Sequence, residues 1–273
     1  MLRLPDIPPQ PLLLRLVLLG ASNLQSSFPR VVHQARRVAG GPVEVVGAFG
    51  HGRSYGAWSR FLFVRQLPGI LQCGLWEELE RRPPLPTVAL VTDVGNDLAY
   101  GERPETIAEW VETCLDRLAR LGAETVLTLL PIESLAFLSP LRYYLARTIL
   151  FPGRGVPRSA LLERANELNS RLQRLGLERG VRLVEPEVSW YGIDPVHIRR
   201  GERDRAWGHI VSHWGLESLA GRTVRSMGEE HLPLQGRRAL WGVRAAELRL
   251  FGRTIHTPQP AGRFEEGTTI ALY

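Results

Sequence analysis

The chain has 273 residues, of which 44% are hydrophobic and 23% are charged, and this composition is typical of a folded globular protein rather than a disordered or fibrous one. Its formal net charge of +6 is carried by arginine alone, because no lysine is present. The arginines are scattered and form no block of like charge, so we expect a solvated surface and no nucleic-acid partner. The two cysteines, Cys73 and Cys114, are too few for a disulfide framework or a cysteine-based metal site.

The apolar run of residues 11–19 has the length of a signal-peptide core. However, Asp6 and Pro8-Pro9 precede it and Arg15 interrupts it, so we interpret it as a strand of the folded protein. No run approaches the roughly 20 apolar residues that a membrane-spanning helix requires. We therefore expect a cytoplasmic protein with no membrane partner.

Strand and helix signals alternate along the chain, in the order typical of a parallel sheet covered by helices on both faces. Short runs of branched apolar residues predict strands at residues 12–19, 43–48, 87–92, 125–130 and 181–184. Helical spacing of apolar residues predicts helices at residues 23–39, 104–121, 159–175 and 202–219, and helical parts within 57–79. We expect a three-layer α/β/α sandwich with a five-stranded parallel sheet.

The C-terminal part of the chain departs from this alternation. Residues 239–250, 253–256 and 268–272 have the composition of short strands and carry no chemical motif. We therefore divide the chain into a main domain, residues 1–221, and a C-terminal extension, residues 222–273. The extension is a candidate surface for self-association.

Four polar segments follow predicted strands at the same end. Ser22 follows the first strand, the glycine-rich residues 47–56 the second, Asn96 the third, and the pair Asp194 and His197 the fifth. The carboxyl ends of parallel strands share one edge of the sheet, where ligands bind in open α/β folds. A serine, a histidine and a carboxylate together provide a nucleophile, its base and the group that orients the base.

These segments resemble the blocks of the SGNH (GDSL-type) hydrolases, over about residues 12–220. The segment Gly20-Ala21-Ser22-Asn23 corresponds to the block that carries the nucleophile, Asn96-Asp97 to the third block, and Asp194-x-x-His197 to the last. The resemblance implies a flavodoxin-like sheet with strand order 2-1-3-4-5. It also implies a Ser22–His197–Asp194 triad and an oxyanion hole formed by the Ser22 amide, a glycine amide and the Asn96 side chain.

The chain departs from the family pattern at three points. Ala21 stands where the family has an aspartate before the nucleophile, and Val94 replaces the glycine that opens the third block. The second block has no clear asparagine, so Gly50 is our choice for the oxyanion glycine, with Gly47 and Gly52 left open. None of these replacements removes a group that performs chemistry.

The resemblance predicts a serine esterase that needs no cofactor and no metal. It would hydrolyse a small-molecule carboxylic ester, with a small acyl, sugar, metabolite or lipid part, through an acyl-enzyme on Ser22. One alternative is an inactive binding module that has kept the fold. Another is an α/β-hydrolase-like enzyme that uses Ser54, because residues 52–56 fit the pattern Gly-x-Ser-x-Gly.

Three further features of the sequence bear on the site: a second serine, a pair of histidines and an aromatic segment. Ser54 lies several residues beyond its strand, so we expect Ser54 and His51 to line the pocket instead. His209 and His213 are four apart on a predicted helix, and neighbouring tryptophans favour packing over a metal site. We interpret residues 132–158 as a surface loop. The alternative is that they cover the pocket, where their aromatic side chains would contact apolar acyl groups and Arg142 or Arg154 an acidic part of the substrate.

Overall fold

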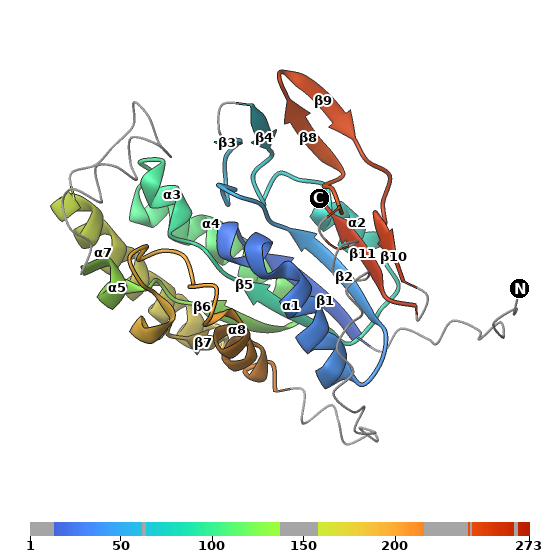
Figure 1. The fold of residues 1–273 in the computed structure, drawn as a ribbon, viewed down its shortest axis with the longest axis horizontal. Coiled ribbons are helices and arrows are strands. Elements are labelled where there is room, and N and C mark those ends of the chain that lie inside the picture. The colour runs from blue at the N-terminus through green and yellow to red at the C-terminus, as the bar shows by residue number, and fades with distance from the viewer. Residues whose placement is uncertain (1–13, 62–63, 137–157, 216–239, 241, 265–266) are drawn as a thin grey trace, which may run out of the picture.

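The computed structural model describes residues 14–61, 64–136, 158–215, 240, 242–264 and 267–273. Its centre is a sheet of seven strands in the order β10-β11-β2-β1-β5-β6-β7 (Figure 1). The five predicted strands are all present, and their bounds are β1 Leu14–Leu19, β2 Val43–Ala48, β5 Thr87–Val91, β6 Glu124–Thr128 and β7 Arg182–Val184. They run parallel in the predicted order, so the three-layer α/β fold class is confirmed.

The sheet is wider than predicted, because the C-terminal segment continues it. Strand β11 (Thr269–Leu272) pairs in parallel with β2, and β10 (Gly262–Arg263) pairs antiparallel with β11. The count of five strands is therefore too low by two. Residues 222–239, which begin the predicted extension, lie outside the described residues.

Helices cover both faces of the sheet and create a separate core on each. Successive strand residues point to opposite faces, so Leu16 and Leu18 of β1 belong to one core while Val17 and Leu19 belong to the other. The first core packs against α1 (Ser22–Ala39) and α8 (Arg203–Ser212). The second packs against α2 (Leu75–Arg81), α4 (Pro104–Arg120) and α7 (Arg158–Glu178).

Arg15 interrupts the first strand in sequence but not in structure. Its side chain is 4% exposed, and its Nε donates to Glu44 Oε2 on the neighbouring strand at 2.5 Å. Arg82, just after α2, donates to the other oxygen of the same carboxylate. A buried charge is tolerated when it is paired and hydrogen-bonded, so this cluster offsets the cost of burying Arg15.

A second sheet lies next to the part of the first that contains β2 and β11 (Figure 1). The sequence predicted strands at residues 239–250 and 253–256 but no second sheet. The antiparallel order of this sheet, β3-β4-β8-β9, combines β3 (Ser59–Phe61) and β4 (Arg65–Leu67) with β8 (Glu247–Leu250) and β9 (Arg253–His256). The helical parts predicted within residues 57–79 are confirmed only from Leu75, where α2 begins; β3 and β4 form a hairpin before it. The hairpin is stabilised by pairing with a remote strand, which local sequence does not reveal.

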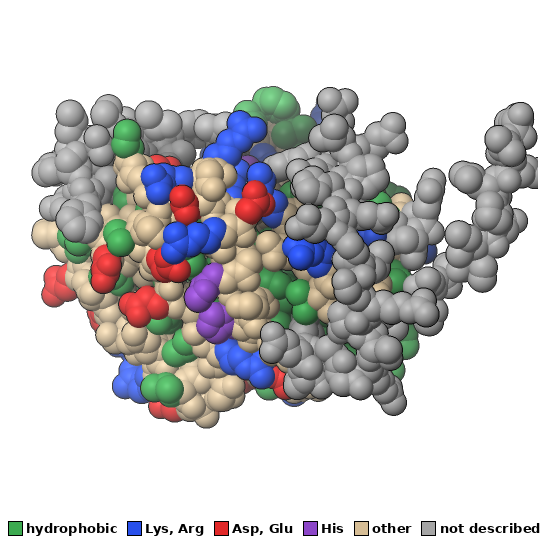
Figure 2. Space-filling model, turned by 60° about the horizontal axis from the view of Figure 1, so that its bottom comes forward, with side chains coloured by type: hydrophobic (Ala, Val, Ile, Leu, Met, Phe, Trp, Pro, Cys, Tyr) green, Lys and Arg blue, Asp and Glu red, His purple; other side chains and the backbone are tan. Residues whose placement is uncertain are grey.

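Three shorter helical segments complete the described parts: α3 (Asn96–Ala99), α5 (Ile132–Ala136) and the 3₁₀ turn η1 (Val188–Trp190). No helix in the described ranges is both long and apolar enough to cross a bilayer. Acidic and basic side chains are interspersed on the face drawn in Figure 2. Among the ion pairs of the described residues, Arg179 pairs with Glu112 and Asp116.

Candidate active site

Ser22 is the first residue of α1 and follows β1 by a two-residue turn. The turn requires a glycine, because a Cβ on Gly20 would lie 2.7 Å from the Thr92 side chain at the end of β5. The two strand ends approach closely there, and the Thr92 amide donates to the Leu19 carbonyl at 2.9 Å. The serine is thereby held at the carboxyl edge of the sheet, half-buried.

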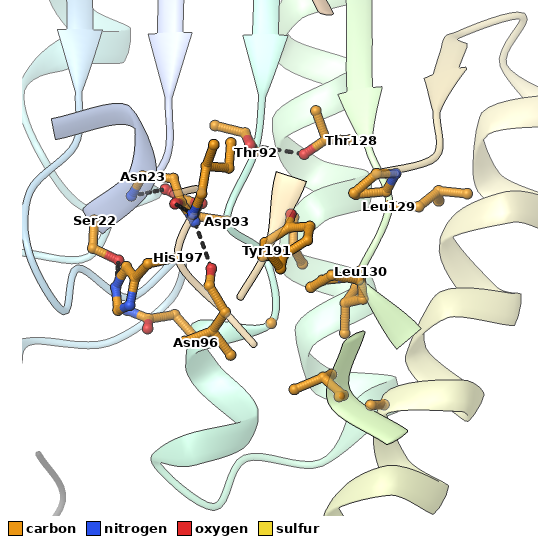
Figure 3. A pocket seen from close by; sticks show the side chains of 18 of the residues that line it. Ser22, Asn23, Thr92, Asp93, Asn96, Thr128, Leu129, Leu130, Tyr191 and His197 are labelled. Atoms are coloured by element: carbon orange, nitrogen blue, oxygen red, sulfur yellow. Dashed lines mark hydrogen bonds between the residues drawn. The ribbon is translucent and has the colours of Figure 1, made fainter. Parts of the chain in front are cut away.

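The structure brings three of the predicted site residues into one chain of hydrogen bonds. Ser22 Oγ lies 2.8 Å from His197 Nε2 (Figure 3). His197 Nδ1 in turn lies 2.7 Å from Asp194 Oδ2. The other carboxylate oxygen, Asp194 Oδ1, accepts the backbone amides of Val196 and His197. The carboxylate is therefore fixed by its own loop while it orients the imidazole.

The same contacts shift the protonation equilibria of the pair. Burial alone would lower the pKa of His197, but the hydrogen bond and charge of Asp194 outweigh it and raise the pKa above the ordinary value. Burial works to raise the pKa of Asp194, and its interaction with His197 lowers it overall. The arrangement stabilises an imidazolium next to Ser22, which is what a base that accepts the serine proton requires.

The first turn of α1 is held by a residue that sequence reasoning did not single out. Asp93 Oδ2 accepts the backbone amides of Ala21, Asn23 and Leu24, at 2.9 to 3.2 Å. The amide of Ser22 has no acceptor among the described residues. It is therefore free to donate to an oxygen bound beside the serine.

Asn96 begins α3 and lines the same cavity as Ser22 and His197 (Figure 3). Its Nδ2 donates to the Arg53 carbonyl at 3.2 Å, which leaves the second amide hydrogen for another acceptor. The neighbouring Asp97 points away from solvent and is fully buried, with Oδ2 accepting the Tyr55 amide at 2.9 Å. Burial raises the pKa of Asp97 to about 6, against the lowering effect of hydrogen bonds from Ser54 and Tyr55.

The three glycines left open by the sequence differ in their surroundings. Gly47 is inside β2 and is paired with both neighbouring strands. Gly50 and Gly52 follow the strand, and neither amide has an acceptor among the described residues. The Gly50 carbonyl accepts the Arg53 amide at 3.0 Å, so Gly50 is linked through Arg53 to Asn96. Neither Gly50 nor Asp194 is among the residues that line the cavity.

A cavity of about 180 Å³ opens beside Ser22 and His197. Figure 3 shows the serine and the histidine on one side and Leu129, Leu130 and Tyr191 on the other. Its wall is mainly apolar and comes from the ends of β5 and β6, from α3, α5 and α7, and from the segment before α8. The main apolar contributors are Leu98, Leu129, Leu130, Leu135, Leu161 and Tyr191.

The structure does not support Ser54 as a nucleophile. Its side chain is buried, and its Oγ accepts the amides of Gly56 and Ala57 at 3.2 and 3.0 Å. Neither Ser54 nor His51 lines the cavity, so that expectation was wrong. His51 is nevertheless close enough to His197 for its pKa to be lowered, first by burial and then by the charges of Arg65 and His197.

The remaining candidates fall outside the site. The rings of His209 and His213 pack edge to face, with centroids 4.8 Å apart, and that of His209 also packs on Trp190. Within the described residues no three His, Cys, Asp or Glu side chains are grouped to hold a metal ion. Arg142 and Arg154, predicted to contact an acidic substrate, lie outside the described residues.

Comparison with known proteins finds no matching family model, and no curated protein has a similar sequence. Solved structures are similar in fold. One crystal structure superposes with a TM-score of 0.50 at 14% identity, covering 78% of this chain and 100% of its own. A similarity at this level of identity shows a shared fold.

Other solved structures are similar at slightly lower scores. Est24, a carbohydrate acetylesterase from Sinorhizobium meliloti, has a TM-score of 0.49 at 14% identity over 77% of this chain and 100% of its own. The native M. smegmatis aryl esterase has 0.48 at 14% identity, over 75% and 99%. A GDSL-like lipase from Bacteroides thetaiotaomicron has 0.45 at 14% identity, over 75% and 88%.

Proposed function

We propose that this protein is a serine esterase of the SGNH (GDSL) type that hydrolyses a carboxylic ester through an acyl-enzyme on Ser22. The observation that carries the proposal is the continuous chain of hydrogen bonds from Ser22 through His197 to Asp194, at the mouth of an apolar cavity. A serine hydroxyl is a weak nucleophile until a base takes its proton, and this arrangement supplies the base and its orienting carboxylate.

In the first half of the reaction, Ser22 Oγ attacks the ester carbonyl while its proton passes to His197 Nε2. The new Oγ–C bond leaves a negative charge on the former carbonyl oxygen. The donors that we assign to this oxygen are the Ser22 amide, the Asn96 side chain and the Gly50 amide. Collapse of the intermediate breaks the bond to the alkoxy oxygen, and the alcohol leaves with the proton from His197.

In the second half, a water molecule gives a proton to His197 and attacks the acyl-enzyme. The carbon–Oγ bond breaks, Ser22 regains its proton from His197, and the carboxylic acid leaves. Asp194 stabilises the imidazolium in both halves, consistent with the raised pKa of His197.

The cavity supports an apolar acyl group as the part of the substrate that enters the protein. Its volume of about 180 Å³ compares with about 150 Å³ for an apolar cavity that binds benzene. It would accept an acyl chain of about six to eight carbons on this scale. The alcohol part would then lie toward solvent.

Labelling with a fluorophosphonate probe, followed by identification of the modified peptide, tests the nucleophile. We expect the label on Ser22, its loss in Ser22→Ala, and retention in two control variants, Ser26→Ala in the same helix and Ser54→Ala. Hydrolysis of nitrophenyl esters should follow the same pattern. Labelling on Ser54 would support the α/β-hydrolase alternative, and an unlabelled, inactive protein would indicate a binding module.

A further inference from the structure

Asp93 has an unusual backbone conformation at the end of β5. Its φ is +59°, in the left-handed region that residues other than glycine rarely adopt, although aspartate and asparagine tolerate it best. This conformation turns the side chain toward the start of α1, where one carboxylate oxygen accepts three backbone amides. Uncommon backbone conformations of this kind persist where the surroundings require them, often at functional sites.

Asn23 connects the same carboxylate to the loop that carries the histidine. Its Nδ2 donates to Asp93 Oδ1 and to the Val196 carbonyl, both at 2.9 Å. Its Oδ1 accepts the amide of Ile198 at 2.9 Å. The side chain of Asn23 is therefore bonded to the residues immediately before and after His197, while its backbone follows Ser22 (Figure 3).

We propose that Asp93 and Asn23 form a positioning pair that holds Ser22 and His197 in reacting geometry, with Asp93 supplying the carboxylate that position 21 lacks. The proposal rests on the esterase function proposed above and names two residues that act through Ser22 and His197 rather than on the substrate. Ala21 has no side-chain acceptor, and α1 has no side-chain cap of its own. The carboxylate of Asp93, from the turn after β5, takes over that role.

The pattern of amides favours a role in catalysis as well as in capping. The first amides of a helix lack partners within the helix, and any acceptor would stabilise them. Asp93 binds the amides on either side of Ser22, while that of Ser22 has no acceptor within the described part of the chain. The carboxylate thus fixes the orientation of the one amide that the oxyanion needs.

The charge of Asp93 also reaches His197. The groups that act on the imidazole are Asp194 and Asp93, which raise its pKa, and Arg203, which lowers it, while His51 lies nearby and interacts with it. Replacing Asp93 by a neutral residue should therefore lower the pKa of His197. A residue that only stabilised the fold would not change this value.

The test uses Asp93→Asn, Asn23→Ala and the double variant, with Asn166→Ala on the exposed surface of α7 as the matched control. Asparagine tolerates the left-handed backbone of position 93, so Asp93→Asn removes the charge while retaining the turn. For each single variant we expect kcat to fall about 10- to 100-fold with KM nearly unchanged, because a displacement of about 1 Å costs on this order. The control should behave as the wild type.

Non-additivity decides whether the two residues act as one pair. The double variant should have a kcat only slightly below that of the less active single variant, because either change alone breaks the connection between the two residues. Losses that multiply, or a wild-type kcat in Asn23→Ala, would overturn the proposal. Should Asp93→Asn fail to fold, Asn23→Asp provides the test, because it keeps the acceptor for Ile198 and removes the donor to Asp93.

The pKa of His197, followed by NMR of its ring protons and assigned with His197→Gln, needs no substrate. We expect Asp93→Asn to lower it and Asn166→Ala to leave it unchanged; an unchanged value in Asp93→Asn would overturn the role of the charge. If Ser22→Ala keeps its esterase activity while Asp93→Asn still shifts His197, then the proposed function fails and the coupling between Asp93 and His197 stands.

Discussion

The hydroxyl of Ser22 lies 2.8 Å from Nε2 of His197, although 175 positions separate the two residues along the chain. The serine follows β1 near the centre of the sheet, and the histidine lies on the segment between β7, at the sheet edge, and α8. That segment must therefore cross back over the ends of β6 and β5. Asn23 fixes this segment around His197, because its side chain bonds to the residues on both sides of the histidine.

Asp194→Asn should reduce kcat by about 10⁴-fold, since the imidazole loses the group that fixes its tautomer and stabilises its charge. In the wild type, activity requires neutral His197, whose pKa is raised above 6.5. We therefore expect kcat/KM to rise with pH through a pKa above 6.5. Steady-state kinetics from pH 5 to 9 with a nitrophenyl ester would measure both effects.

Asp194→Asn should also shift the dependence of kcat/KM on pH. Loss of the carboxylate removes what raises the pKa of His197, so the residual activity should rise at lower pH than in the wild type. A profile with the same midpoint, or a loss of less than about tenfold, would contradict the role assigned to Asp194.

Asn96→Ala should lower kcat by about 10²- to 10³-fold with little change in KM, because a donor to the oxyanion contributes mainly in the transition state. Nitrophenyl ester kinetics would measure the loss, with circular dichroism to verify the fold, since Asn96 also donates to the Arg53 carbonyl. Asn166→Ala, on the surface of α7, is the control for loss of an amide. Equal values of kcat in Asn96→Ala and Asn166→Ala would show that Asn96 is not a donor to the oxyanion.

Ala99→Phe should shift the enzyme toward short acyl groups. Ala99 lines the cavity from α3 and is only half-buried, so a larger side chain can occupy the cavity without overpacking a core. We expect kcat/KM for an octanoyl ester to fall at least about tenfold, while that for an acetyl ester stays near the wild-type value. Comparable losses on both esters would show that the acyl group does not enter this cavity.

Asp97→Asn should change how stability depends on pH. The pKa of Asp97 is raised to about 6 in the folded protein, against about 3.9 when unfolded, because it is fully buried. The folded state therefore favours the protonated acid. The contribution of protonated Asp97 to the free energy of unfolding is present below about pH 4 and is lost as the pH rises to about 6. Relative to the variant, the wild type should lose on the order of 2–3 kcal/mol of unfolding free energy across this window.

Urea unfolding at pH 4, 5, 6 and 7 would measure this difference. Parallel curves for the wild type and Asp97→Asn would show that Asp97 does not titrate in this range. Equal m-values in the two proteins are required for the comparison, since they show that unfolding exposes the same surface.

Much of the sheet was predictable because its strands are buried on both faces. Runs such as residues 12–19 and 43–48 are then almost entirely apolar, with Arg15 and Glu44 as the charged exceptions. The hairpin of β3 and β4 escaped prediction since its strands have three residues each and depend on pairing with β8. Local sequence carries little information about such a contact.

The candidate site was predictable where a motif encodes spacing, as in Asp194-x-x-His197. Asp93 and Asn23 carry no such spacing, and their importance is visible only in the hydrogen bonds and the backbone of the folded chain. Asn23 follows Ser22 in the sequence, and this position was only a weak indication that its side chain belongs to the site. Nothing in the sequence indicated that Asp93 would accept the backbone amides on either side of Ser22.

Strand β11 bonds to β2, so residues 269–272 pair with residues 44–47. The ribosome synthesises most of the chain between these two partners, and during that interval one side of β2 lacks its native neighbour. Open strand edges recruit strands from other molecules, and contacts this distant in sequence form slowly. We therefore expect nascent chains released before residue 269 to aggregate, and chaperones that cover exposed strands to improve the yield of folded protein.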